Sequence, residues 1–193
     1  MTRWTRRLAA CLAVGTVVLT GCSEKQEASP TLPTSSAAAK TTSALPPLGP
    51  AEFPVPAEAR QKTPQGAVEF VQYYVSLTRY LAEHSLATDP LKDLSQNCRS
   101  CSNIAQSLDD DQAAHYRYTE YVSEFKENGP ALLDGDTAQM GFLYTQGPVT
   151  AIDQTGSVVS ERSTATAEQF QSGAILRWRS DLTSWVITEL TVG

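Results

Sequence analysis

The spacing of apolar side chains changes along this 193-residue chain, and the change limits the folds open to it. Before Asn128 most apolar residues recur every three or four positions, as on one face of a helix. After Pro130 they alternate with polar residues, as in strands with one buried face. Helices followed by antiparallel strands predict an α+β fold in which a curved sheet wraps the helices.

Local capping signals place the helices. Thr63 offers a hydroxyl cap and Pro64 a first helical residue without an N–H, and Asp89 and Pro90 repeat this signal. Helices are expected over residues 64–83, 89–94 and 98–110. The apolar stripe of the first helix is wide enough to predict burial on more than one side.

Strands are expected over residues 116–125, 138–146, 149–152, 174–179 and 185–190. The first of these contains an irregularity in its alternation, and a helix is the rival interpretation there. Gly147 and Pro148 are expected to interrupt the sheet between the second and third strands. Residues 153–156 favour a hairpin turn, with the return beginning at Val158 and Val159.

The N-terminus has the features of an export signal. Three arginines within the first seven residues precede an uncharged apolar stretch over residues 8–19. Leu19-Thr20-Gly21-Cys22 follows and resembles the lipobox of bacterial lipoprotein precursors. This resemblance implies cleavage before Cys22 and a diacylglycerol on its thiol, whose two acyl chains give a stable membrane anchor. An ordinary signal peptide, or an uncleaved membrane anchor, is the alternative.

Domain boundaries follow from composition. Residues 1–21 are expected to be a lipoprotein signal peptide, and residues 22–57, which hold seven of the 11 prolines, a disordered Ser/Thr/Pro-rich tether. Residues 58–193 suit one domain with a single core. Cleavage leaves 12 basic and 21 acidic residues, a net charge of −9, which disfavours nucleic acid as a partner. The expected location is the extracytoplasmic face of the cell membrane, anchored through Cys22.

Two further cysteines remain after Cys22 in the mature chain. Outside the cytoplasm, Cys98 and Cys101 are expected to form a disulfide that staples the start of the third helix. Thiol-disulfide exchange is the alternative role. Zinc would need His84 and His115 beside the two thiolates, at spacings unlike those of a zinc finger. No metal and no cofactor is therefore expected.

Three groups of residues carry a family resemblance. They are Thr63-Pro64-Gln65-Gly66-Ala67 leading into Phe70-Val71-Gln72-Tyr73-Tyr74, the Cys98-Arg99-Ser100-Cys101 motif, and Leu176-Arg177-Trp178 with Trp185-Val186-Ile187. The sequence resembles an uncharacterised family of exported lipoproteins from high-GC Gram-positive bacteria with a nuclear-transport-factor-2-like fold. The resemblance implies helices inside a cone-shaped sheet, and it lends no activity.

No catalytic motif is recognisable in the sequence. We therefore expect a non-catalytic module that holds a small apolar ligand in the cone or docks onto an envelope protein. An isomerase-like or dehydratase-like enzyme of the cone fold is the alternative, with Tyr74 and Asp93 as the kind of donor and base it would need. The acidic run at residues 109–111 is expected to be a solvated helix end.

Overall fold

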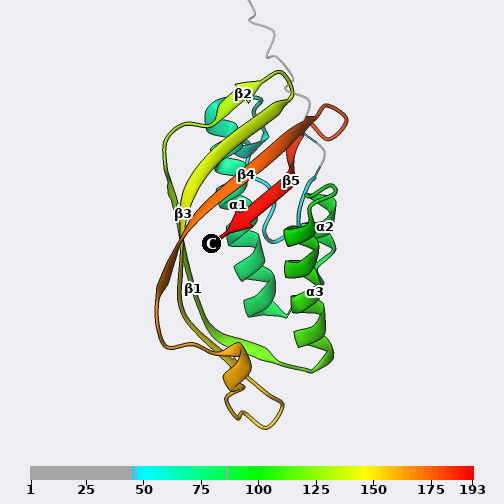
Figure 1. The fold of residues 1–193 in the computed structure, drawn as a ribbon. Coiled ribbons are helices and arrows are strands. Elements are labelled where there is room, and N and C mark those ends of the chain that lie inside the picture. The colour runs from blue at the N-terminus through cyan, green and yellow to red at the C-terminus, as the bar shows by residue number, and fades with distance from the viewer. Residues whose placement is uncertain (1–44, 46, 86) are drawn as a thin grey trace, which may run out of the picture. The chain divides into compact units, whose positions relative to one another are not determined.

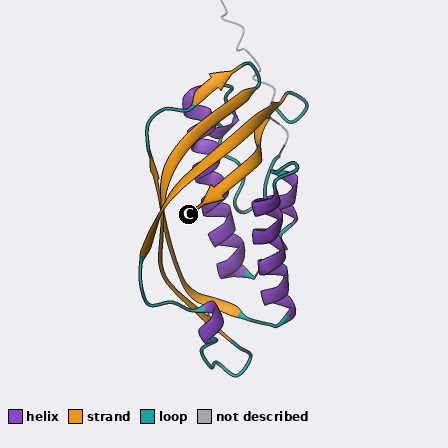
Figure 2. Ribbon diagram, in the orientation of Figure 1, coloured by secondary structure: helices purple, strands orange, loops and turns teal. Residues whose placement is uncertain are grey.

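Helices come first in this chain and pack against one face of a curved antiparallel sheet (Figures 1 and 2). The computed structural model describes residue 45, residues 47–85 and residues 87–193. The expected α+β fold, with helices packed against a curved antiparallel sheet, is confirmed.

The helices begin close to where the capping signals place them. They are α1 (Pro64–His84), α2 (Asp89–Asp93) and α3 (Arg99–Ala113), preceded by a short 3₁₀ helix, η1 (Glu58–Arg60). The Thr63 hydroxyl accepts a hydrogen bond from the amide of Gly66 at 3.0 Å, as expected of a cap. The cap residue of α2 is Thr88 and not Asp89. The Thr88 hydroxyl does not cap the helix but donates a hydrogen bond of 2.6 Å to Asp109.

The broad apolar stripe of α1 is buried over consecutive residues, so more than one side of this helix is covered. The sheet provides part of the cover, and residues 47–57 provide another part. Phe53 stacks on Tyr73 and Tyr80, with ring centroids 5.4 and 4.6 Å apart, and Val55 is buried. The last part of the expected tether is therefore ordered, because its few apolar side chains find partners on α1.

The sheet contains five strands in the order β1-β3-β4-β5, with β2 also paired to β3, and every neighbouring pair is antiparallel. Their bounds are β1 (Arg117–Glu127), β2 (Leu132–Asp134), β3 (Thr137–Ile152), β4 (Glu168–Arg179) and β5 (Ser184–Val192). The short strand β2 was not expected. Strand β4 begins six residues before its expected start at residue 174, in a polar segment without apolar alternation.

Strand β1 is a strand with two register shifts, which confirms the irregular strand over the rival helix. The expected interruption at Gly147 and Pro148 is wrong, since β3 runs through both residues. A β-carbon at Gly147 would lie 2.7 Å from the side chain of Val122, so glycine is required for β1 to approach. Proline is tolerated beside it because the ladder is already irregular between Tyr121 and Ser123.

The fully buried core includes Trp185 of β5, whose indole N–H donates to the carbonyl of Gln61 at 2.9 Å. The connection between α2 and α3 covers the outer edge of β5. There the Gln96 amide donates to Ile187 at 2.8 Å, and the Ile187 amide donates to Leu94 at 3.0 Å. Among the described residues, no helix has the length and apolar character needed to cross a bilayer.

Candidate functional site

A cleft of about 270 Å³ opens on the sheet where β1 and β3 meet the connection between β3 and β4. This connection carries the short helix η2 (Ser160–Arg162) at the foot of Figure 1. The lining residues are Tyr118, Tyr121, Gln146, Val149, Glu161, Arg162, Ser163 and Thr164. We refer to this space as the tyrosine cleft.

A buried carboxylate lies behind the tyrosine cleft. Asp111 of α3 is only 2% exposed, and its Oδ2 accepts a hydrogen bond of 2.6 Å from the hydroxyl of Tyr118. Its Oδ1 lies 2.8 Å from Nε of Arg162. The Arg162 guanidinium also donates to Ser107 of α3 at 3.4 Å. The two contacts of Arg162 tie η2 to α3 across the edge of the cleft.

The expectation that the acidic run forms a solvated helix end is wrong for Asp111. Asp110 is exposed and Asp109 is partly exposed, but Asp111 is buried. The cause is helical spacing, because Ala105, Leu108 and Asp111 recur every three residues on one face of α3. Continuing the apolar stripe by one turn would have revealed this carboxylate in the sequence.

The tyrosines of the cleft are held as neutral hydrogen-bonding groups. The rings of Tyr118 and Tyr121 meet edge to face, with centroids 5.6 Å apart. Burial raises the pKa of Tyr118, and the neighbouring Asp111 carboxylate raises it further. Burial likewise raises the pKa of Tyr121, with a smaller contribution from Tyr144. All these hydroxyls therefore remain protonated at neutral pH.

Two other hollows help to locate the site. A space of about 50 Å³ shares Tyr121 with the cleft and is otherwise enclosed mainly by apolar side chains of α1, β3 and β5. A wider depression of about 540 Å³ lies at the ends of α1 and α3, beside His115 and Arg117. None of its lining side chains is buried. The tyrosine cleft is the better candidate because two partly buried tyrosines line it and one of them is bonded to the buried carboxylate of Asp111.

The residues suggested for an enzyme of the cone fold do not form a site. The Tyr74 hydroxyl donates to the carbonyl of Leu91 at 3.3 Å, and burial raises the pKa of Tyr74 to about 12. Asp93 is exposed at the end of α2. The buried carboxylate beside a tyrosine is Asp111 with Tyr118, a pair that was not predicted from the sequence.

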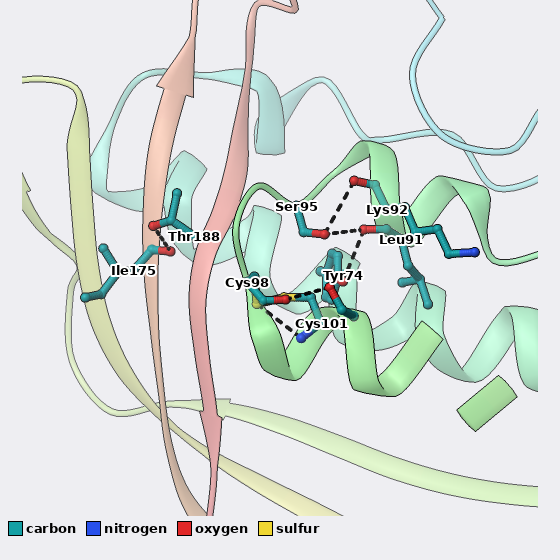
Figure 3. The surroundings of a disulfide bond; sticks show 9 residues. Tyr74, Leu91, Lys92, Ser95, Cys98, Cys101, Ile175 and Thr188 are labelled. Atoms are coloured by element: carbon teal, nitrogen blue, oxygen red, sulfur yellow. Dashed lines mark hydrogen bonds between the residues drawn. A yellow bond between two sulfur atoms is a disulfide. The ribbon is translucent and has the colours of Figure 1, made fainter. Parts of the chain in front are cut away.

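Cys98 and Cys101 form the expected disulfide at the start of α3, with an S–S distance of 2.04 Å. Figure 3 shows the disulfide beside Tyr74 and Ser95. The Ser95 hydroxyl donates to the Leu91 carbonyl at 2.8 Å. The two cysteines are 3% and 1% exposed. Burial favours a structural role over thiol-disulfide exchange. The two sulfur atoms are bonded to each other, so they are not present as the thiolates that a zinc site would need.

The predicted signal peptide over residues 1–21, the predicted lipidation at Cys22 and the part of the predicted 22–57 tether up to residue 44 lie outside the described residues. They remain predictions from the sequence.

No curated protein matches this sequence. The intermembrane-space region of the chloroplast protein ARC6 superposes with a TM-score of 0.54 at 12% identity, covering 68% of this chain and 97% of that one. A nuclear transport factor 2-like superfamily protein from Salmonella enterica serovar Typhimurium gives a TM-score of 0.38 at 12% identity, covering 66% and 90%. The likeness to the ARC6 region extends to the fold alone. A family of unknown function (DUF6318) matches residues 51–191, and the chain belongs to this family.

Proposed function

We propose that this chain is a lipoprotein, anchored through Cys22 at the extracytoplasmic face of the membrane, that binds a small molecule in the tyrosine cleft without transforming it. One observation carries the binding role. Tyr118 and Arg162, which both contact the buried carboxylate of Asp111, line a cleft of about 270 Å³. Five of the eight lining residues are polar or charged, so the cleft offers a ligand several hydrogen-bonding groups beside the tyrosine rings.

The walls of the cleft suit a compact ligand. Val149 and the rings of Tyr118 and Tyr121 supply apolar and aromatic surface. Gln146 and Thr164 add groups that donate or accept hydrogen bonds. A volume of about 270 Å³ is slightly below the range of roughly 300 to 1,000 Å³ found for drug-sized ligands. We therefore expect a ligand of one ring or a short chain.

The surroundings of Asp111 favour binding over catalysis. A general base needs a lone pair directed at the substrate. In this site Oδ2 accepts the hydrogen bond of Tyr118, and Oδ1 faces the guanidinium of Arg162. The carboxylate is thus engaged by the protein on both oxygens, which suits a group that holds α3, β1 and η2 together.

Native mass spectrometry tests the binding role. The full chain, extracted gently from its own membrane, is expected to carry a reproducible excess mass that disappears on denaturation. Thr164→Trp should abolish the excess mass, because an indole at this lining position fills the cleft. The matched control Thr166→Trp places the same group at an exposed position outside the lining and should retain the ligand. A ligand-free wild-type mass would contradict the proposal.

The anchor is tested separately. The charged start, the apolar stretch and the motif ending at Cys22 support lipidation. Cys22→Ala should release the protein into the medium, because it removes the acylated thiol. Cys11→Ala, within the expected signal peptide, is the matched control and should leave the protein on the membrane. Membrane retention of the Cys22→Ala variant would contradict the anchor.

A further inference from the structure

The charges around the tyrosine cleft point to the class of its ligand. We infer that the cleft selects a small organic ammonium ion over an anion of the same size. This inference rests on the proposed binding function and adds the sign of the ligand's charge.

The charge balance of the lining residues is the first argument. Two charged side chains, Glu161 and Arg162, line the cleft. The positive charge of Arg162 is matched by Asp111, whose Oδ1 lies 2.8 Å from Nε. Glu161 is exposed and forms no ion pair with another described residue. The charge left unmatched in the cleft is therefore negative, and it attracts a cation.

The aromatic lining is the second argument. Tyr118 and Tyr121 present ring surface to the cleft from one strand, and their edge-to-face contact turns the two rings toward different directions. Ring faces attract alkylammonium groups, most strongly where water is excluded. Both phenols are neutral at pH 7, as an ordinary tyrosine is, so they add no negative charge to the cleft.

Asp111 fixes the positions of two lining residues. Its carboxylate accepts the hydrogen bond of Tyr118 and lies 2.8 Å from Nε of Arg162. Arg162 lines the cleft, whereas Asp111 is buried and does not. The guanidinium is therefore nearer to a bound ligand than the carboxylate that matches its charge, and it limits the affinity for a cation.

Calorimetric titration of the full lipidated chain in detergent with two probes tests the inference. Phenethylamine and 3-phenylpropionate have the same ring and a similar length but opposite charge at pH 7. We expect phenethylamine to bind and 3-phenylpropionate to give no heat of binding. Glu161→Gln should weaken phenethylamine binding about fivefold, because it removes the unmatched negative charge. Glu124→Gln removes the same charge from an exposed position outside the cleft lining and should change nothing.

Arg162→Gln gives a result of opposite sign. It should strengthen phenethylamine binding about fivefold, since a repelling cation leaves the cleft. Tryptophan fluorescence checks that the Arg162→Gln variant folds. If this variant does not fold, Glu161→Gln alone tests the sign of the ligand's charge. Binding of 3-phenylpropionate with loss in Arg162→Gln would overturn the cation assignment and leave the binding function standing. Failure of both probes to bind would also overturn the cation assignment, while the native mass decides the binding function independently.

Discussion

The interior between the helices and the sheet has two differently built halves. In the closed half, between α1, α3 and β5, the fully buried side chains include Phe70, Leu77 and Trp185. In the open half, beyond the end of β5, the space between β1, β3 and η2 is lined by Tyr118 and Tyr121. Figure 1 shows β5 ending part-way along β4, and the pairing of these strands stops at Ser172 and Val192.

The two halves differ in the side chains that fill them. Apolar side chains that interdigitate fill the closed half, and burial of this kind supplies most of the folding free energy. The open half exchanges part of that packing for hydroxyls and an ion pair, which contribute less to folding and offer specific contacts to a ligand. We therefore expect substitutions in the closed half to cost more stability than those in the open half.

Trp185→Ala should have the largest effect. Trp185 is 0% exposed, so its removal leaves a cavity in the closed half and should lower the free energy of unfolding by about 4 kcal/mol. Urea denaturation followed by circular dichroism measures the loss. Val192→Ala, at a position 45% exposed, should cost less than about 0.5 kcal/mol. Similar losses in the two variants would contradict the prediction that packing around Trp185 contributes most to stability.

Alkaline pH should destabilise the protein through Tyr74. Its pKa is raised to about 12 by burial, against about 10 in an unfolded chain. The contribution of this neutral phenol is therefore fully present below about pH 10 and lost as the pH rises through 12, a loss of about 3 kcal/mol. Urea titrations between pH 8 and 12 measure it. In Tyr74→Phe the decline should be smaller; an unchanged decline would show that other groups cause it.

Removing the disulfide should have an intermediate effect. The bond between Cys98 and Cys101 closes a very short loop, so its loss in the Cys98→Ala/Cys101→Ala variant should cost about 2 kcal/mol. The midpoint of urea unfolding measures the cost. Because the disulfide belongs to the closed half, the native excess mass should survive in the folded variant. Loss of the ligand without loss of stability would place the disulfide in the binding function instead.

Apart from the control variants, Tyr118→Phe should have the smallest effect on stability. It removes the hydroxyl that donates to Asp111 at 2.6 Å and leaves that oxygen of the buried carboxylate without its donor, at a cost of about 1 kcal/mol. Tyr116→Phe makes the same chemical change at a partly buried tyrosine outside the cleft lining. Comparison of their urea midpoints isolates the contact with Asp111. Equal midpoints would mean that the hydrogen bond adds nothing to folding.

Local sequence signals predict the closed half better than the open half. Thr63 and Pro64 mark the start of α1, and the apolar run Trp185-Val186-Ile187 marks β5, because caps and short apolar runs depend on neighbouring residues. The tyrosine cleft draws Asp111 from α3, Tyr118 from β1 and Arg162 from η2. No local pattern relates such distant residues. The burial of Asp111 alone could be predicted locally, because the apolar stripe of α3 continues from Leu108 to Asp111.

The confinement of ligand to the open half is the central claim, and amide chemical-shift mapping of the ¹⁵N-labelled full chain tests it most directly. On addition of phenethylamine, we predict shifts at Tyr118, Tyr121 and the residues of η2. The indole N–H of Trp185, which is bonded to Gln61 in the closed half, should not move. Shifts centred on Trp185, or saturation without any shift in β1 and η2, would contradict the account.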